Sequence, residues 1–323
     1  MSLCSFITNI FNSNHIPVEI NRTLLVLIPK VDYPTSLKMF RPISLCTVPY
    51  KTVTKIIANR LHDFLPDLIG PQQTSFVPGW HITDNFVIAQ EVIHTMKKNV
   101  GGKRMMAVKV DLEKAYDRLS WCFIKETLKE VGLPERFTHL IMECLSTSQM
   151  NVLWNGEMIE DFQLGRGIRQ GDPLSPYIFV LCIERLSHGI IQAVNQGRWK
   201  PIRLARIGTP LSHLFFVDDL VLFLEANYAQ VDVLNDVVEN FCRSSGAKVS
   251  KQKIQIFFSK NVPITLASGI GKALGFSVTN NLGRYLGMPL LHDWVSKKTY
   301  QSIIDKIDQR LSGWAVKHLS LAG

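Results

Sequence analysis

The sequence lacks the cysteine spacing that marks a metal site or a disulfide framework. Its six cysteines are scattered along 323 residues, with no CxxC pair and no histidine at metal-ligand spacing from any of them. Such cysteines are typical of buried free thiols in a reducing compartment. We therefore expect an intracellular protein, either nuclear or cytoplasmic.

Long apolar runs and targeting segments are also missing. No run reaches the roughly 18 residues that a membrane span needs, and the opening MSLCSFITNIFNSNHIP lacks the charged start and cleavage site of a signal peptide. Low-complexity tracts, linkers and internal repeats are absent as well. We expect one continuous α/β body that does not enter a membrane.

What the chain does have is an excess of positive charge. The 36 Lys and Arg residues against 27 Asp and Glu give a formal charge of +9 and a pI near 9.2. The excess is concentrated between Arg22 and Arg60, where seven basic residues stand against one acid, Asp32. This balance favours a polyanionic partner, such as nucleic acid or an anionic membrane surface. A solvated charged face is the alternative.

Apolar periodicity predicts the main elements of the chain. β-Branched and apolar runs indicate strands at 22–30, 104–112 and 253–258. Apolar residues at helical spacing, closed by Gly or Pro, predict helices at 49–70, 83–98, 120–134 and 229–246.

The segment from residue 151 to 194 combines a hairpin, a glycine-rich loop and a helix. Asn155 and Gly156 predict the hairpin turn, and Asp172 with Pro173 suits the N-cap and first turn of the helix. Strand, helix, hairpin and helix in this order resemble a split βαβ sheet with helices on one face. We therefore expect an α+β fold.

Two adjacent carboxylates stand between apolar runs in LFFVDDLVLF, residues 214–223. If the runs are the strands of a β-hairpin, Asp218 and Asp219 lie at its turn, where Asn-Gly or Gly-X is usual. Charges about 4 Å apart repel by about 1 kcal/mol in water and roughly 4 kcal/mol at an effective dielectric of 20. An exposed acidic turn is the alternative, but these flanks are too apolar for a solvated loop, so a cation is needed.

A second strand ends in a carboxylate after the same kind of apolar run, at Asp111 in MMAVKVDLEKAYD. If the two strands are neighbours, Asp111, Asp218 and Asp219 meet at one edge of a sheet. Hard oxygen ligands that leave room for water and phosphate suit Mg²⁺, and two such ions clamp the attacking and leaving oxygens in phosphoryl transfer. The sequence therefore predicts a magnesium site at this edge.

Several motifs in a fixed order carry a resemblance to a known family. VKVDLEKAYD, GIRQGDPLSP and FFVDDL follow LIPK and FRPISL and precede RYLGMPL. Together they resemble the reverse transcriptase domain of non-LTR (LINE-type) retrotransposons, the plant members above all. The resemblance implies a right-hand polymerase with fingers at 21–104, a palm at 105–290 and a thumb only begun at 291–323, after a helical lead-in at 1–20.

The resemblance also assigns roles to single residues of this sequence. It implies Asp111, Asp218 and Asp219 as the catalytic carboxylates and metal ligands, with the Leu112 backbone carbonyl as a further ligand. Tyr116 takes the place of an aromatic that blocks a ribose 2′-OH. The residues implied in dNTP binding are Lys30, Arg41, Tyr116, Gln170 and Gly171, and those implied in nucleic-acid contact are Phe216, Val217 and Lys253.

What the resemblance implies about activity is RNA-directed DNA synthesis. A primer 3′-OH attacks the α-phosphate of a template-selected dNTP, with two Mg²⁺ ions, for which Mn²⁺ can substitute. The partners are then an RNA template, a DNA primer and dNTPs, and no protein partner is implied.

Two alternatives stay open at this point. Related plant elements have a basic residue where this chain has Trp80 and an asparagine at Ser250. These changes and the truncated thumb favour a catalytically inert remnant that at most binds nucleic acid. The second alternative is an organellar intron maturase, which would need a downstream RNA-binding extension. We expect His81 and His213 to serve packing or solvent exposure rather than ligation.

Overall fold

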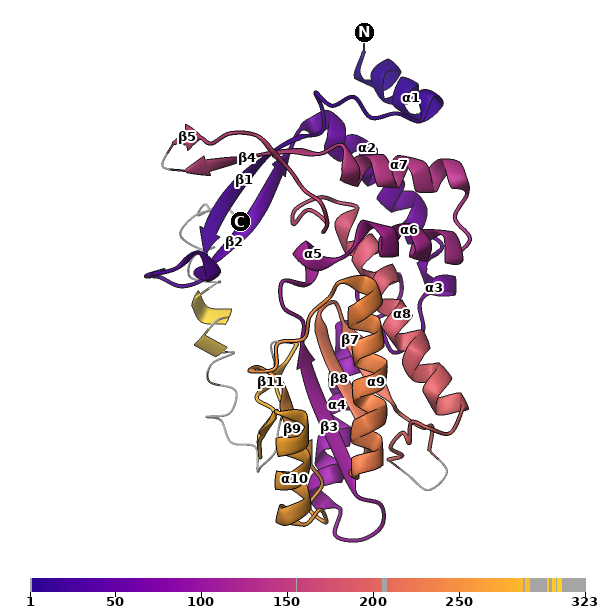
Figure 1. Ribbon diagram of the computed structural model, residues 1–323, viewed down its shortest axis with the longest axis vertical. Coiled ribbons are helices and arrows are strands. Elements are labelled where there is room, and N and C mark those ends of the chain that lie inside the picture. Colours follow the sequence, from indigo (N-terminus) through magenta and orange to yellow (C-terminus); the bar gives the residue numbers. More distant parts are fainter. Residues whose placement is uncertain are drawn as a thin grey trace, which may run out of the picture.

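The computed structural model describes an elongated α+β molecule in which two five-stranded sheets lie in different parts of the molecule (Figure 1). The predicted α+β class is therefore confirmed. The first sheet has the strand order β2-β1-β4-β5, with β6 also pairing with β4, and the second has the order β10-β9-β3-β8-β7. The described residues are 2–154, 156–204, 208–286 and 288–290, with 301, 304–305 and 307–309.

The first sheet is built around a long two-stranded ribbon. β1 (Arg22–Pro29) pairs antiparallel with β2 (Phe40–Cys46) from its second residue, Thr23, to its end. The short 3₁₀ helix η1 (Leu37–Met39) lies in their connection. β1 also pairs in parallel with β4 (Gln149–Trp154), but only over its first four residues. The sheet is completed by β5 (Glu157–Met158) and β6 (Phe162–Gln163).

The strands of this sheet do not follow the linear boundary expected between fingers and palm. β4 to β6 come from the range expected to be palm, yet they join the sheet of β1 and β2. The Asn155 part of the predicted hairpin turn lies outside the described residues, while Gly156 has a positive φ of 87°. A boundary at residue 105 therefore does not separate the two sheets.

A group of helices packs beside the first sheet. The helix predicted at 49–70 is broken into two, α2 (Val48–His62) and α3 (Leu65–Leu68). The break has a local cause, because Pro66 has no N–H for the His62 carbonyl and its ring would clash there. The other helices of the group are α1 (Leu3–Ser13), α6 (Trp121–Glu130) and α7 (Glu135–Ser146).

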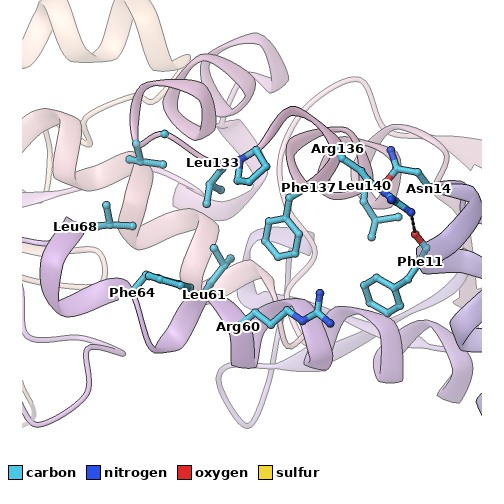
Figure 2. A pocket seen from close by; sticks show the side chains of 13 residues that line it. Phe11, Asn14, Arg60, Leu61, Phe64, Leu68, Leu133, Arg136, Phe137 and Leu140 are labelled. Carbon is cyan, nitrogen blue, oxygen red and sulfur yellow. Dashed lines mark hydrogen bonds between the residues drawn. The ribbon is translucent and has the colours of Figure 1, made fainter.

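An open cavity of 620 Å³ lies between α1, α2, α3 and α7 (Figure 2). Leu61, Phe64, Phe137 and Leu140 line it, and its polar lining includes the guanidinium groups of Arg60 and Arg136 together with Asn14. None of the residues predicted to act in catalysis, dNTP binding or nucleic-acid contact lines this cavity.

The second sheet carries helices on both faces, which adds to the one covered face expected from the sequence. Its strands are β3 (Met105–Asp111), β7 (His213–Phe216), β8 (Asp219–Glu225), β9 (Gln255–Phe258) and β10 (Ser277–Val278). On one face lie α8 (Ser175–Asn195) and α9 (Tyr228–Ser245), and on the other lies α4 (Ile82–Lys98).

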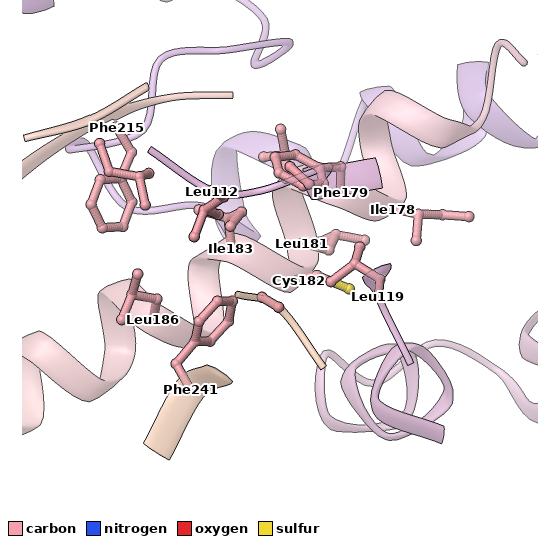
Figure 3. Packing of buried hydrophobic residues seen from close by; sticks show 14 of the residues in the cluster. Leu112, Leu119, Ile178, Phe179, Leu181, Cys182, Ile183, Leu186, Phe215 and Phe241 are labelled. Atoms are coloured by element: carbon pink, nitrogen blue, oxygen red, sulfur yellow. The ribbon is translucent and has the colours of Figure 1, made fainter. Parts of the chain in front are cut away.

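The alternation of side chains along β3 and β8 explains this arrangement. Val108 and Leu222 belong to the larger core cluster. The same cluster contains Phe179 of α8 and Phe241 of α9, both labelled in Figure 3. Their neighbours in the strands, such as Ala107 and Phe223, point to the opposite face and pack with α4. Since both faces are buried, the strands read as continuous apolar runs.

Helix α8 is the central helix of the larger core. By length and composition it is the one described helix that could cross a membrane, and 61% of its most apolar 18-residue window is buried. Its buried residues include Phe179, Ile183 and Leu186, which pack with strand and helix residues in Figure 3.

The start of α8 differs from the prediction that Asp172 caps it. The helix begins at Ser175, after Leu174, with Pro176 in its first turn. The Asp172 carboxylate instead accepts hydrogen bonds from the Leu174 amide at 3.0 Å and from the Tyr50 hydroxyl at 2.8 Å. The Asp172 side chain therefore takes part in a buried tertiary contact, whereas local rules would have it cap the helix.

The remaining described elements are short. α5 (Ala115–Arg118) follows β3, and α10 (Ile264–Leu274) follows β9. Gly246 ends α9 in the left-handed conformation, as predicted. β11 (Arg284–Tyr285) and β12 (Met288–Pro289) form a small hairpin. The expected start of the thumb at 291–323 lies almost entirely outside the described residues.

Candidate active site

The three predicted carboxylates gather at one edge of the second sheet. β3 and β8 are antiparallel neighbours, and their register places Asp111 opposite Asp219. Asp218 precedes Asp219 in the turn that joins β7 to β8. The expected convergence of the two strands therefore occurs, and strand pairing alone produces it.

The turn itself is shifted by one residue from the prediction. Phe216 pairs with Asp219, so the two central turn residues are Val217 and Asp218, and Asp219 is the first residue of β8. Val217 has a positive φ of 53°, which a type II′ turn requires at this position and which a β-branched residue rarely adopts. The shift leaves Asp218 exposed and Asp219 half-buried.

Two lysines, Lys109 on β3 and Lys253 before β9, offset the crowded negative charge. The Lys253 ammonium lies 3.1 Å from the Asp111 carboxylate. Burial raises the pKa of Asp219, and the charges of Asp218 and Asp111 raise it further, while Lys109 opposes them. The carboxylates are thus close enough to influence one another, and the two lysines make their proximity tolerable.

The carboxylates are not yet arranged as a closed metal-binding set. Within the described ranges, no group of three His, Cys, Asp or Glu side chains is placed tightly enough to hold a metal ion. The donor chemistry nevertheless fits a hard divalent cation, since three carboxylates share one edge and one of them is paired with an ammonium group. Leu112 follows Asp111 directly, and the resemblance adds its backbone carbonyl to the ligand set. In the structure, Leu112 forms an isolated β-bridge with Val249.

Tyr116 lies in α5, in the turn that leaves β3. Its ring stacks on that of Phe179 with centroids 4.8 Å apart and planes inclined by 9°. Burial raises the pKa of the Tyr116 hydroxyl, and the negative charge of Asp218 raises it further. The side chain is therefore held by the core close to the acidic edge.

The glycine-rich loop contacts the first sheet. The carbonyl of Gln170 accepts a hydrogen bond of 2.7 Å from the amide of Ser44 in β2. Gly171 has a φ of 110°, and a Cβ atom there would lie 2.9 Å from the Ser44 carbonyl oxygen. A side chain at residue 171 would therefore clash with β2, so the glycine allows the loop to approach this strand closely.

A residue that the sequence analysis missed anchors this loop. Arg169 is buried and donates to Asn21 at 2.7 Å, Thr23 at 2.9 Å and the Cys144 carbonyl at 2.7 Å. Its guanidinium also bonds the Tyr50 hydroxyl and lies 3.8 Å from Asp172. The signal available in the sequence was an arginine directly before the glycine motif, but its partners lie up to 148 residues away.

The two predicted phosphate-binding residues lie on the β1–β2 ribbon and not at the carboxylate edge. Lys30 follows β1 and is exposed, with its ammonium 3.1 Å from the Lys38 carbonyl. Arg41 is exposed on β2, opposite Ile28. Lys30 is one of the cations that lower the pKa of Asp117 in α5, against the larger effect of burial. Its charge therefore reaches the segment that carries Tyr116.

The structure also shows the environments of four other residues noted in the sequence: Trp80, Ser250, His213 and His81. Trp80 is half-buried against the larger core, and the Ser250 amide donates to the Asp111 carbonyl at 2.9 Å. His213 is fully buried, bonded to Ser212 and Ser187 at 2.9 Å each, and burial lowers its pKa to about 3. The expectation that His213 serves packing agrees with this environment. His81 is exposed at the start of α4.

Comparison with known protein families identifies the domain. Residues 28–290 match the family described as reverse transcriptase (RNA-dependent DNA polymerase). The chain belongs to this family. The carboxylate edge, Tyr116 and the glycine-rich loop all lie within the matched residues.

Similar sequences come from non-LTR retrotransposon proteins, as predicted. The chain is 29% identical over 240 residues to the Pol polyprotein of the type-2 retrotransposable element R2DM of Drosophila melanogaster, covering 74% of this chain and 21% of that protein. It is 31% identical over 178 residues to the Transposon TX1 uncharacterized 149 kDa protein of Xenopus laevis, covering 55% and 14%. The chain thus spans a small part of these relatives.

A plant origin remains a prediction. Over 54 residues the chain is 52% identical to the uncharacterized mitochondrial protein AtMg01250 of Arabidopsis thaliana, which covers 17% of this chain and 44% of that protein. Among solved structures, the chain is similar to telomerase of Candida tropicalis in complex with a fragment of telomeric RNA. The match covers 92% of this chain and 48% of the telomerase chain. The TM-score is 0.57 at 13% identity. This likeness supports the polymerase fold alone.

Proposed function

We propose that this domain adds deoxynucleotides to a primer 3′-OH opposite an RNA template. The observation that carries the proposal is the register of β3 and β8, which sets Asp111 against Asp219 with Asp218 beside them. A sheet edge with three carboxylates is costly unless a cation is bound, so its construction from two separate strands points to metal-assisted phosphoryl transfer.

In this proposal Asp111, Asp218, Asp219 and the Leu112 carbonyl hold divalent ions, Mg²⁺ or Mn²⁺ in its place. When bound, these ions supply a lower pKa for the primer hydroxyl and charge stabilisation for the departing pyrophosphate. The Lys253 ammonium, now 3.1 Å from the Asp111 carboxylate, has to release it when a cation binds. Its exposed position suits a subsequent contact with nucleic acid.

The residues around the edge select and orient the substrates. Tyr116, fixed by its stacking on Phe179, would close the space that a ribose 2′-OH needs. Gln170 and Gly171 would line the nucleotide pocket, and Lys30 and Arg41 on the ribbon would contact the triphosphate. Phe216 and Val217 at the turn would contact the primer. The choice of nucleotide would come from base pairing with the template. The reaction would take place in the nucleus or the cytoplasm.

The test is primer extension with purified protein on a poly(rA)/oligo(dT) duplex with Mg²⁺ and dTTP. The matched control is the double variant Asp218→Asn, Asp219→Asn, which keeps the shape of the turn and removes both charges. We expect extension by the natural chain and none by the variant, with salt-dependent duplex binding in both. Equal extension by both proteins would refute the metal site, and duplex binding without extension by either would favour the inert remnant.

A further inference from the structure

The turn that carries Asp218 is held in a strained conformation by a contact from outside the hairpin. Val217 has a φ of 53°, where glycine is usual in a two-residue hairpin. Strained residues of this kind persist only when the surrounding structure fixes them. The Val217 amide donates a hydrogen bond of 2.6 Å to the hydroxyl oxygen of Ser75, a residue 142 positions earlier in the chain.

Ser75 ends a segment that runs alongside β7. The amide of Phe215 donates to the Gln72 carbonyl at 2.7 Å, and Gln73 forms a parallel bridge with Phe215. From α4, Asn85 donates its side-chain amide to the Phe215 carbonyl at 2.9 Å. The segment therefore acts as a short extra strand on the free side of β7, opposite the side that pairs with β8.

The position of Ser75 is itself fixed. Its side chain is buried, with 1% of the residue exposed, and its amide donates to the side-chain oxygen of Gln73 at 3.0 Å. Gln73 is fully buried as well. A hydroxyl held in this way presents a stationary acceptor to the amide of the first central turn residue, next to Asp218.

We propose that Ser75 is a positioning residue for the carboxylate turn. The inference rests on the proposed function, since it assigns Ser75 a role in that same reaction. Ser75 does not touch the substrate in this account. Its hydroxyl keeps Val217 at positive φ and thereby fixes where Asp218 and Asp219 stand relative to Asp111. Without the hydroxyl the turn relaxes, and the three carboxylates no longer hold one arrangement.

The activity test compares Ser75→Ala with Thr74→Val. Thr74 is the neighbouring residue and also buried, and its hydroxyl has no hydrogen-bond partner among the described residues, so the control removes a hydroxyl without removing a bond. We expect Ser75→Ala to lower kcat for dTTP addition by about tenfold, the order of effect of one lost buried hydrogen bond. KM for dTTP should stay within about twofold, because the binding residues are untouched.

A second measurement does not require activity. Amide hydrogen exchange, followed by mass spectrometry on peptides spanning residues 214–221, reports on the turn directly. We expect faster exchange in Ser75→Ala than in the natural chain, and no change in Thr74→Val.

The outcomes separate this inference from the proposed function. Unchanged kcat and unchanged exchange in Ser75→Ala would overturn the role of Ser75, as would equal losses in both variants. If the natural chain extends no primer, the proposed function fails, and the exchange measurement still decides whether Ser75 holds the turn.

Discussion

The two hairpins that carry the proposed active-site residues are held in different ways. The β7–β8 hairpin is paired with β3 on one side and with the Gln72–Ser75 segment on the other, and its strands are buried on both faces. The outer half of the β1–β2 ribbon is paired only with itself among the described residues, because β4 reaches just Arg22–Leu25. A two-stranded ribbon alone is marginal in water.

This difference matches what each hairpin is proposed to do. Carboxylates that share metal ions need fixed positions, and the packed sheet supplies them. Lys30 and Arg41 are exposed on the ribbon, so their positions depend on the ligand they meet. Under the proposed function, the fold builds the metal site, while the substrate completes the triphosphate contacts. Each prediction below alters one of these two regions or the link between them.

The largest effect is expected from breaking the link. Arg169→Met removes the buried guanidinium that ties the glycine-rich loop to β1 and α2 and leaves the Asp172 carboxylate without its cation. Loss of one partner from a buried pair costs about 3–5 kcal/mol. Urea denaturation should show a fall of that size in the unfolding free energy. The control Arg166→Met, an exposed arginine of the same loop, should stay within about 0.5 kcal/mol.

A smaller effect is expected from changing a buried carboxylic acid of α8. Glu184 of α8 is buried, accepts the Gly70 amide at 3.1 Å, and lies 3.7 Å from His188. Burial raises its pKa to about 7. Because the folded state then holds the proton more tightly than the unfolded state, the stability this group contributes is lost as the pH rises from about 4.5 to about 7.

Glu184→Gln keeps the acceptor and removes the titration. We expect the variant to be more stable than the natural chain by about 1–3 kcal/mol at pH 8 and to match it near pH 4.5. Denaturant unfolding across this pH range, taken as the difference between the two proteins, measures it. A difference that is independent of pH would show that the pKa of Glu184 is the same in the folded and unfolded states.

Changes in the β1–β2 ribbon are expected to weaken the affinity for dTTP. Lys30→Met and Arg41→Met each remove one proposed triphosphate contact, and each should raise KM for dTTP by about tenfold with kcat changed by less than about threefold. Lys38→Met is the control, since this exposed lysine lies on the same ribbon without a predicted contact. A fall in kcat at constant KM would place these side chains at the reaction centre instead.

The smallest effect concerns the ion pair between Lys253 and Asp111. Both side chains are largely solvated, 68% and 42% exposed, so Lys253→Met should change the unfolding free energy by less than about 1 kcal/mol. Thermal unfolding without metal measures this change. A larger loss would mean that the ammonium group, rather than the packed sheet, holds the carboxylate edge together.

Much of the palm could be predicted because it rests on local signals. The apolar runs around Asp111 and Asp219 indicated buried strands, and pairing them fixed the carboxylate edge. The turn was placed one residue late, since local rules disfavour a β-branched residue such as Val217 at positive φ. The contact that stabilises this conformation comes from Ser75, which no local rule connects to the turn.

The parts that escaped prediction depend on contacts between distant segments. Asp172 has the right type and place for a helix N-cap, but Tyr50 and Arg169 engage its carboxylate. The helix at 49–70 showed one continuous apolar pattern, and its Pro66 was the only sign of the break. Sequence patterns thus indicated which residues carry the chemistry, while the polar contacts that support them required the folded structure.

The central claim, a metal site at the β3–β8 edge, can be tested without nucleic acid. Fe²⁺ is substituted for Mg²⁺ and hydrogen peroxide is added. The bound Fe²⁺ reduces the peroxide to a hydroxyl radical that cleaves the backbone nearby, ascorbate returns Fe³⁺ to Fe²⁺, and mass spectrometry maps the cuts. The account predicts cleavage near Asp111 and near Asp218, lost in the Asp111→Asn, Asp219→Asn variant and suppressed by excess Mg²⁺. Cleavage confined to other segments, or unchanged in the variant, would contradict it.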